Sequence, residues 1–484
     1  MSYFPSWAYQ TIELCAHLLN LSDAMYTRAE TDSLGTIQVP RYALWGAQTA
    51  RSLHFFAIGK QRMPLEIIHA LAWVKWAAAK VNSDLGLIDS SKAQAIADAA
   101  HKVAMGQFDD EFPLSVWQTG SGTQSHMNVN EVIANLAIQA LGDTNASTKP
   151  IHPNDDVNLG QSSNDVFPTA MHIAILIQTN QQLLPALARL REAIMEKSAA
   201  FEDVIKIGRT HLQDATPITL GQEFSGYAAQ LSMCEQSIDQ ARAAVYTLAI
   251  GGTAVGSGLH THSDFGARVA ALLAEKLELP LTQAENLFAA MAGHEALVAL
   301  HGALKMLAVA LFKITSDIRL MGSGPRTGLG ELKLPQNEPG SSIMPGKINP
   351  TQVEALTMVC AQVMGHDVAV SFAASQGQLE LNVYKPLIAL NVLDSIRLLS
   401  DAMVSFSTHC VVGIEVDSAR IQVHVQNSLM LVTALVPHIG YDASAKIAIQ
   451  ANNSGSSLRE AALASGLVSA DQFNEWVNPS KMLG

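Results

Sequence analysis

Residues 337–350, NEPGSSIMPGKINP, gather several chemically capable side chains into one short segment. Ser341 and Ser342 carry hydroxyl groups, Lys347 carries a cation and Asn349 carries an amide donor. Such a set suits a small carboxylate, because the cation and the amide can hold the anion while a hydroxyl accepts a proton. The glycines and prolines predict a loop, and its length favours a functional one. A polar surface loop explains these residues equally well when they are taken alone.

Four other polar segments contain further candidate donors: TGSGTQSHMNVN (119–130), HPNDDVN (152–158), GQSSND (160–165) and GRTHLQDATP (208–217). Most of them stand at or near the predicted start of a long helix, where unpaired backbone N–H groups attract anions. Neutral side-chain donors would add to these groups: Ser121, Thr123, Ser162, Ser163, Asn164 and Thr210. Helix capping explains any one of these residues better, but five polar segments together favour a site for a dianion.

The chain is acidic, with 30 Lys and Arg residues against 43 Asp and Glu residues and a formal net charge of −13. No dense Lys/Arg run is present, which argues against nucleic acid or an anionic membrane as a partner. Hydrophobic residues make up 48% and charged residues 15% of the sequence. This composition suits subunits that bury wide surfaces against each other, so we expect an oligomer.

Long helices are expected to position these segments. Apolar residues recur at steps of three and four from Leu297 to Ile318, which predicts one long helix. Further helices are expected at 165–194, with a kink or break at Pro185, at about 216–250 and at about 381–406. Alternating β-type segments are almost absent between Gln124 and His409. The predicted fold class is therefore all-α, with a long-helix bundle as its core.

The 484 residues exceed one ordinary domain, so two or three regions are expected. Glycine-rich breaks at 251–258 and 322–331 separate the predicted helices. We predict the following division: an extension of uncertain status at 1–27, a mainly helical N-terminal domain at 28–160, a central long-helix bundle at 161–415 and a small helical C-terminal domain at 416–484.

Several features bear on the cellular compartment. The first two dozen residues contain no Lys or Arg, so no signal or transit peptide is expected. Apolar stretches are interrupted before they reach about 18 residues, so no membrane span is expected. The cysteines Cys15, Cys234, Cys360 and Cys410 are widely spaced, which favours a reduced compartment without structural zinc. A cytoplasmic location is the default expectation.

Seven segments together resemble the class II fumarate hydratases, in the same order and spacing: TGSGTQS, HPND, QSSNDVFPTAMH, GRTHLQDATP, IGGTAVGSG, SGPR and GSSIMPGKINPTQ. The resemblance runs from about Arg28 to Gly484. The pattern GSSIMPxKxNP is shared across the fumarase/aspartase superfamily, whereas TGSGTQS, HPND and PGKxNPTQ favour the fumarases. The resemblance implies a homotetrameric hydro-lyase of the tricarboxylic acid cycle that interconverts fumarate and L-malate without a metal or organic cofactor.

The resemblance also implies catalytic roles. Ser341 would be the base that removes the carbon-bound proton of malate, an unusual task for an alcohol. His211, oriented by Glu338, would manage the water on the opposite face, because imidazole titrates near neutral pH. Glu354 matches a position that the family needs for activity, without a defined role. In the family these residues come from three different subunits, so the site would exist only in the tetramer.

The remaining implied residues bind anions. Substrate would be held by Ser121, Gly122, Thr123, Ser162, Ser163, Asn164, Thr210, Ser342, Lys347 and Asn349. A second anion site outside the main pocket would comprise Lys149, His152, Pro153, Asn154 and Asp155, although a histidine before a proline is also typical of an ordinary loop. Asp32, Arg51 and Glu331 stand in familiar stretches, and we interpret them as structural ion pairs.

The sequence departs from the family pattern near these sites. His126 stands where the family usually has asparagine, and it is larger and can titrate. Leu159 and Leu287 replace expected lysines, and Leu136 replaces an expected arginine. The loss of three cations would weaken attraction for a dianion, within the roughly 8–10 Å that salt screening allows. Turnover is therefore expected to be reduced.

Two alternative functions stay open. An aspartate ammonia-lyase would share the fold and the serine loop, but GTQS and Gly346 before Lys347 argue against it. A catalytically weak paralogue that acts as a binding or assembly protein is the other alternative, supported by His126 and the leucine replacements. Binding of fumarate without turnover would favour the latter.

Overall fold

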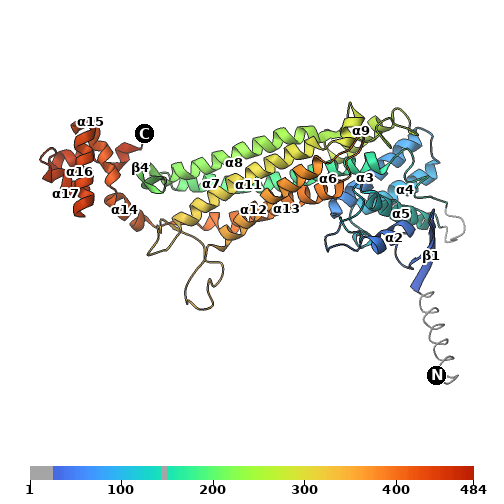
Figure 1. The fold of residues 1–484 in the computed structure, drawn as a ribbon, viewed down its shortest axis with the longest axis horizontal. Coiled ribbons are helices and arrows are strands. Elements are labelled where there is room, and N and C mark those ends of the chain that lie inside the picture. The colour runs from blue at the N-terminus through green and yellow to red at the C-terminus, as the bar shows by residue number, and fades with distance from the viewer. Residues whose placement is uncertain (1–25, 143–149, 484) are drawn as a thin grey trace, which may run out of the picture. The chain divides into compact units, whose positions relative to one another are not determined.

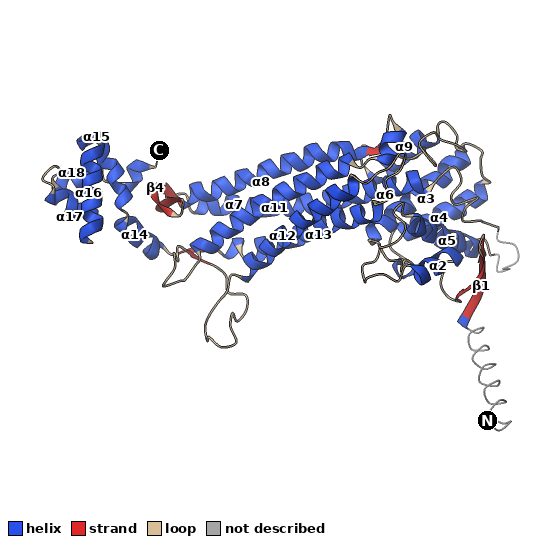
Figure 2. Cartoon of the chain, in the orientation of Figure 1, coloured by secondary structure: helices blue, strands red, loops and turns tan. Residues whose placement is uncertain are grey.

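The computed structural model describes residues 26–142 and 150–483, so Cys15 and Lys149 lie outside the described residues. Helices dominate the described chain (Figure 2). The described chain forms two compact units, each assembled from separate stretches of sequence. Unit 1 comprises Met1–Asn180, Asp239–Gly302 and Gly365–Ile396, and unit 2 comprises Gln181–Ile238, Ala303–Met364 and Arg397–Gly484.

Unit 1 begins with an antiparallel hairpin of two strands, β1 (Thr27–Asp32) and β2 (Gly35–Pro40). Its helices follow in chain order (Figure 1): α2 (Ala47–Phe55), α3 (Leu65–Asp84), α4 (Ser90–Ala104), α5 (Thr123–Ala140), α6 (Ser163–Gln178), α9 (Phe265–Leu277) and α10 (Leu287–Ala292). The short strands β5 (Thr247–Leu248) and β6 (Thr282–Gln283) pair in parallel. Helix α3 packs against α4, α6 and α9, and most of its apolar side chains are buried, which makes it the centre of this unit.

Unit 2 contains a second antiparallel hairpin, of β3 (Ile205–Thr210) and β4 (Gln213–Thr219). Helix α7 (Leu184–Ala200) precedes this hairpin, and α8 (Leu220–Arg242) follows it. Strands β7 (Leu332–Lys333) and β8 (Glu415–Val416) form a short antiparallel pair. The C-terminal helices are α14 (Ser418–Asn427), α15 (Val436–Ile439), α16 (Tyr441–Ser454), α17 (Leu458–Ala464) and α18 (Ala470–Trp476). They share an apolar cluster that includes Leu435, Ile447 and Phe473.

Three further long helices contribute residues to both units, as α8 also does at its last turn: α11 (Glu295–Met321), α12 (Thr351–Ala374) and α13 (Lys385–His409). In α11 the predicted apolar series is buried at every position, with Leu297, Leu304 and Leu311 all at 0% exposure. Each such side chain contributes about 1.5–3 kcal/mol when it leaves water. The all-α fold with long helices at its core is therefore confirmed.

The other predicted helices differ in their boundaries. The predicted helix 165–194 is interrupted by a π-helical turn at Thr179–Leu183, and α7 then begins with Pro185 in its first turn. The prediction of a helix from about 216 to 250 is wrong at both ends. Thr216 lies in β4, since its strand pairs with β3, and the helix α8 ends at Arg242.

The expectation that the chain has no membrane span stays a prediction, although two helices are longer and more apolar than expected from the sequence. Helices α11 and α12 both have the length and composition required, although buried core helices pass the same test. Half of the relevant window of α11 is buried, but only 28% of that of α12. Helix α12 therefore presents an apolar surface that the single chain leaves exposed.

Candidate functional site

Two predicted donor segments lie at neighbouring helix starts in unit 1. Gly122 precedes α5 in a left-handed conformation with φ of 77°, and a Cβ there would stand 2.3 Å from the ring of Phe167 in α6. Only glycine permits this approach. Ser121 and Thr123 flank Gly122, and their hydroxyl oxygens are 2.8 Å apart. The start of α5 is thereby packed against the first turns of α6.

The start of α6 is an N-terminal capping box. Ser162 Oγ accepts from Asn164 N at 3.2 Å, and Asp165 Oδ1 accepts from Ser162 N at 2.9 Å. Such reciprocal bonds satisfy donors that a helix start otherwise leaves open. The hydroxyl of Ser163 and the backbone around it remain at the positive end of the helix dipole, where an anion is stabilised.

Asp165 also anchors the glycine-rich segment 251–258. Its Oδ2 accepts from Gly251 N at 3.0 Å and from Thr253 N at 3.1 Å, while Asn164 Nδ2 donates to Ala254 O at 2.8 Å. Burial raises the pKa of Asp165 to about 6, against the opposing effects of these N–H donors. The carboxyl group therefore holds the segment onto the start of α6.

A histidine and a lysine lie buried behind these helix starts. His126 Nδ1 is 2.7 Å from Ser163 Oγ, and burial lowers the pKa of His126, as does the nearby Lys75. Lys75 Nζ donates to Asn158 Oδ1 and Gln161 Oε1, both at 2.9 Å, and burial lowers its pKa well below the usual value. Lys75 thus fixes the segment that leads into α6. Leu159 stands where the family pattern places a lysine and offers no cation, and its carbonyl oxygen accepts from Asn82 Nδ2 at 3.0 Å.

In unit 2 the turn of the β3–β4 hairpin carries His211. Thr210 pairs with Gln213, so His211 and Leu212 form a two-residue turn, with φ of 58° and 59°. A turn of this kind favours asparagine and glycine, and bulkier residues are strained in it. The hairpin therefore holds an exposed histidine in a costly conformation, a feature that often marks a functional position.

A buried ion cluster supports this hairpin. Glu331 has 0% exposure, and its oxygens lie 2.8 Å from Arg209 Nη1 and 3.0 Å from Lys206 Nζ. Burial alone would raise the pKa of Glu331, but the two cations outweigh it and lower the pKa. In unit 1, Arg51 forms two bonds to Asp32, at 2.7 and 3.0 Å. The structural ion pairs expected at Asp32, Arg51 and Glu331 are thus present.

The loop that contains Ser341 also lies in unit 2. Ser341 Oγ accepts from Ile343 N at 3.2 Å and from Met344 N at 2.9 Å. Asn349 Nδ2 donates to Gly340 O at 2.5 Å, and Gly340 N donates to Lys347 O at 3.0 Å. These bonds close the loop on itself, so that Ser341, Lys347 and Asn349 belong to one local structure. Ser342 and Glu338 are exposed on the same loop.

Glu354 lies in the first turn of α12, the helix that follows this loop. Its Oε1 is 3.6 Å from Arg319 Nη2 in α11, and both side chains are largely exposed. A solvated pair of this kind contributes little to stability. The carboxylate is therefore accessible next to the serine loop.

The segment predicted as a second anion site borders a cavity of about 540 Å³ in unit 1. His152 Nδ1 accepts from Asn154 N at 3.3 Å and from Asp155 N at 3.2 Å, which gives the segment a compact turn. The described part of the cavity lining holds the carboxylates of Glu30, Asp32 and Glu131 and no Lys or Arg. Lys149, the predicted cation, lies outside the described residues.

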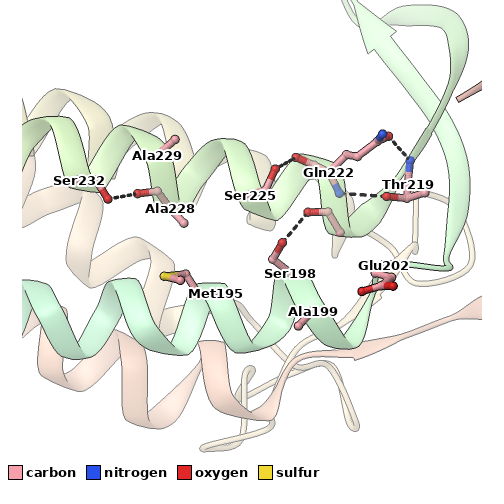
Figure 3. Close-up of a pocket in the computed structure, with 11 residues that line it drawn as sticks. Met195, Ser198, Ala199, Glu202, Thr219, Gln222, Ser225, Ala228, Ala229 and Ser232 are labelled. Atoms are coloured by element: carbon pink, nitrogen blue, oxygen red, sulfur yellow. Dashed lines mark hydrogen bonds between the residues drawn. The ribbon is translucent and has the colours of Figure 1, made fainter. Parts of the chain in front are cut away.

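Another cavity, of about 650 Å³, lies along α7 and α8 in unit 2 (Figure 3). Its polar groups are engaged with one another: Ser198 donates to Gly221 O, and Thr219 and Gln222 exchange two bonds. None of the predicted site residues lines it. This cavity does not mark the candidate site.

The single chain thus builds two groups of predicted residues in different units. Unit 1 holds the helix starts with Ser121, Gly122, Thr123, Ser162, Ser163 and Asn164, and unit 2 holds Thr210, His211, Glu338, Ser341, Ser342, Lys347, Asn349 and Glu354. Sequence reasoning missed Lys75 and the second role of Asp165. A lone lysine in the apolar stretch LAWVKWAAA and an acidic residue three positions after Ser162 were the available signals.

Metal-binding clusters of three or more His, Cys, Asp or Glu residues are absent from residues 26–142 and 150–483. Cys234, Cys360 and Cys410 are free and buried, and burial raises the pKa of Cys234 to about 11 and those of Cys360 and Cys410 to about 12. These thiols are therefore protonated and poorly reactive at neutral pH.

Comparison with known proteins identifies the family. A lyase family model matches residues 35–365, and a model of the fumarase C C-terminus matches residues 431–484. The chain is 60% identical to the class II fumarate hydratase of Thermosynechococcus vestitus, over 95% of this chain and 98% of that protein, and 60% identical to that of Chromobacterium violaceum, over 94% and 99%.

Solved structures agree with this assignment. The class II fumarase of Schistosoma mansoni superposes with a TM-score of 0.92 at 47% identity, covering 94% of this chain and 99% of that one. A fumarate lyase:delta crystallin of Brucella melitensis, bound to cobalt, superposes with a TM-score of 0.91 at 42% identity, covering 95% and 100%. The chain therefore belongs to the class II fumarate hydratase family and is a lyase of the hydro-lyase type.

Proposed function

We propose that this protein catalyses the reversible trans hydration of fumarate to L-malate, without a metal or organic cofactor. The observation that carries the proposal is the 60% identity to fumarate hydratases along nearly the whole chain. The two adjoining helix starts in unit 1 support it, because they offer backbone and hydroxyl donors suited to a dicarboxylate. By the same likeness we propose a cytoplasmic enzyme of the tricarboxylic acid cycle.

Ser341 is the proposed base for the carbon-bound proton. An alcohol serves as a base only if its alkoxide is stabilised, and the N–H groups of Ile343 and Met344 already point at its oxygen. Lys347 and Asn349 on the same loop would stabilise the negative charge that builds up on the substrate carboxylate. The closed loop supports this proposal, because it keeps these three groups within one local structure.

The substrate carboxylates are proposed to bind Ser121, Gly122 and Thr123 at the start of α5 and Ser162, Ser163 and Asn164 at the start of α6, with Thr210 and Ser342 as further donors. Neutral donors of this kind hold a dianion without the desolvation cost of burying many cations. They also offset, in part, the cations absent at Leu136, Leu159 and Leu287.

His211 is proposed to manage the water on the opposite face of the substrate, with Glu338 as its orienting carboxylate. An imidazole can both accept and donate a proton near neutral pH. The strained, exposed turn that carries His211 supports this role. Two groups that act on two faces account for trans addition. Glu354 is proposed to assist from the start of α12.

We further propose that the active unit is a homotetramer in which three subunits contribute to each site. Helix α12 carries an exposed apolar stripe, with Met358 at 68%, Val368 at 70% and Phe372 at 63% exposure. Monomeric proteins rarely leave such apolar stripes exposed to water, so we propose that a second copy of the chain packs against the stripe on α12. Shared sites would also explain why the predicted site residues are divided, with the helix-start donors in unit 1 and the predicted catalytic residues in unit 2.

A second anion site at Lys149, His152, Pro153, Asn154 and Asp155 is proposed by likeness alone. The turn in which two N–H groups donate to His152 Nδ1 gives it a defined shape. Two of the neighbouring carboxylates, Glu30 and Asp32, are already paired with Arg28 and Arg51, so they would oppose anion binding only weakly.

The decisive experiment follows the ultraviolet absorbance of fumarate after addition of purified protein. Wild type should consume the signal, and Ser341→Ala should lower kcat by at least about 10²-fold, as expected for loss of a general base. Ser342→Ala is the matched control on the same loop, and it should affect KM more than kcat. Formation of fumarate from aspartate would assign an ammonia-lyase instead, and fumarate binding without turnover would assign a binding protein.

A further inference from the structure

A side-chain hydrogen bond joins the two helix starts that are proposed to bind the substrate. His126 Nδ1 and Ser163 Oγ are 2.7 Å apart. His126 lies in the first turn of α5, where its backbone N–H donates to Gly122 O at 3.0 Å. Ser163 is the first residue of α6. The bond therefore connects the first turn of α5 directly to Ser163, whose hydroxyl is proposed to bind the substrate.

The bond to Ser163 is the hydrogen bond that the described structure shows for the His126 ring. The side chain has 0% exposure, and its Nε2 has no hydrogen-bond partner among the described residues. Burial lowers the pKa of His126, and repulsion from Lys75 lowers it further, so the ring is neutral near pH 7. A neutral imidazole carries a single N–H, on one of its two nitrogens. The location of that proton decides what Ser163 can do.

We propose that His126 is a positioning residue for substrate binding: its Nδ1–H donates to Ser163 Oγ and leaves the serine proton free for a substrate carboxylate. A hydroxyl has one proton, so Ser163 cannot donate to the imidazole and to a carboxylate at the same time. The inference rests on the proposed function, because it takes Ser163 as a substrate ligand. His126 acts through Ser163 and does not itself carry out the chemistry.

The chemistry of possible replacements separates this role from simple packing. An asparagine amide stands the same number of bonds from Cα as His126 Nδ1, and it can donate in the same place. A glutamine amide stands one bond farther out, and leucine fills similar space without any donor. Asparagine is also the residue that the family pattern places here, so the geometry predicts that histidine and asparagine are functional equivalents at this position.

The test compares His126→Asn, His126→Gln and His126→Leu in the full-length protein, by kcat and KM for fumarate. His126→Leu should raise KM about tenfold, with a change in kcat below about threefold, because a bound-state hydrogen bond is lost. His126→Asn should keep KM within about threefold of wild type, and His126→Gln should resemble the leucine variant. Equal KM values for the asparagine, glutamine and leucine variants would overturn the proposal.

A double-mutant cycle isolates the link to Ser163. In a Ser163→Ala background, His126→Leu should change KM by less than about twofold, since the group that it positions is already gone. The same tenfold effect in both backgrounds would show that His126 acts elsewhere and would overturn the proposal. If the leucine variant does not fold, the asparagine and glutamine variants still give the comparison.

His172→Leu is the control for loss of a partly buried, hydrogen-bonded histidine. His172 lies in α6, the helix that begins with Ser163, and its Nδ1 is 2.9 Å from both Val245 O and Thr247 O, away from the start of that helix. This variant should lower thermal stability without raising KM. If wild type fails to hydrate fumarate, the proposed function and this inference both fall. If wild type is active but the KM pattern above is absent, the positioning role alone is wrong.

Discussion

Asp165 is a buried carboxyl group that serves three backbone donors at once. The N–H groups of Ser162, Gly251 and Thr253 favour its ionised form, yet burial dominates and raises its pKa to about 6. An aspartate in an unfolded chain titrates near 3.8. Between these two values the native protein holds a proton that the unfolded chain has lost. Stability contributed by this residue is therefore greatest below about pH 4 and falls as the pH rises towards 6.

Asp165→Asn should remove this pH dependence. The substitution costs stability at every pH, because an amide offers one acceptor oxygen to three donors. As the pH rises from 4 to 7, wild type loses the stability that protonated Asp165 contributes, whereas the variant does not. The difference in free energy of unfolding should therefore shift in favour of the variant by up to about 3 kcal/mol, which corresponds to a pKa difference of about two. Thermal unfolding of both proteins across this range, at one protein concentration, measures the gap. A gap that stays constant with pH would contradict the prediction.

At the residue scale, the sequence indicated which side chains could form hydrogen bonds but not which residues they would bond to. Ser162 and Asp165 were recognisable as a capping pattern, since both bonds are local. The bonds from Lys75 to Asn158 and Gln161, and from His126 to Ser163, join residues far apart in the chain. No spacing rule encodes such pairs, because they depend on how α3, α5 and α6 pack. The predicted roles of Ser341, His211 and Glu354 stay predictions.

At the scale of elements, Gly122 decides how closely α5 approaches α6. Gly122→Ala should destabilise the protein by about 2–5 kcal/mol, which combines left-handed backbone strain with overpacking against Phe167. It should also raise KM for fumarate, because Thr123 and Ser163 would move apart. Thermal unfolding and steady-state kinetics measure the two effects.

Gly142 supplies the control for that substitution. It lies just after the other end of α5 with a similar φ of 75°, and a Cβ there would meet nothing within 4 Å. Gly142→Ala should therefore show the backbone strain alone, about 1–2 kcal/mol, with KM unchanged. Equal losses for the two variants would mean that the contact with Phe167 is unimportant.

The long helices were predictable because their apolar residues follow a single period along one face, as Leu297 to Ile318 do in α11. The start of α8 was not predictable from the sequence, because the preceding residues 213–219 become a strand only by pairing with β3. The helix break was expected at Pro185, but it lies a few residues earlier, at the π-helical turn Thr179–Leu183. Element type followed local pattern, whereas element ends followed contacts that are distant in sequence.

At the scale of the whole molecule, the proposal that subunits share each active site can be tested by a complementation experiment. Ser341→Ala and His211→Asn should each be nearly inactive. When they are co-expressed in equal amounts, up to about one quarter of the sites should regain both residues, because a mixed symmetric oligomer draws them from different subunits. Fumarate hydration by the purified mixture measures the recovery.

The control pairs two defects on the same loop. A mixture of Ser341→Ala with Lys347→Ala should stay inactive, since both residues come from one loop of one subunit. Recovery in neither mixture would contradict the proposal that subunits share each site, and it would place Ser341 and His211 of the same chain in one site.

The family and the all-α fold were predictable from motifs and helix periods, and both are now shown. The division into regions at 28–160, 161–415 and 416–484 stays a prediction. The two compact units do not correspond to these consecutive regions, because each unit combines three separate stretches of sequence, and the long helices contribute to both units. Helices that pass from one unit to the other make sequence boundaries a poor guide to structural ones.

The attachment of segment 251–258 to Asp165 matters to anyone who wishes to engineer this protein. Four glycines make IGGTAVGSG look like a tolerant place for a tag, a fluorescent insert or new chain ends. Its backbone amides at Gly251 and Thr253 are nevertheless bound to a carboxylate at 0% exposure, so residues 251–253 are built into the interior. Loop-like composition and permissiveness to insertion are separate properties here, and the safer graft points lie where the backbone donates to water.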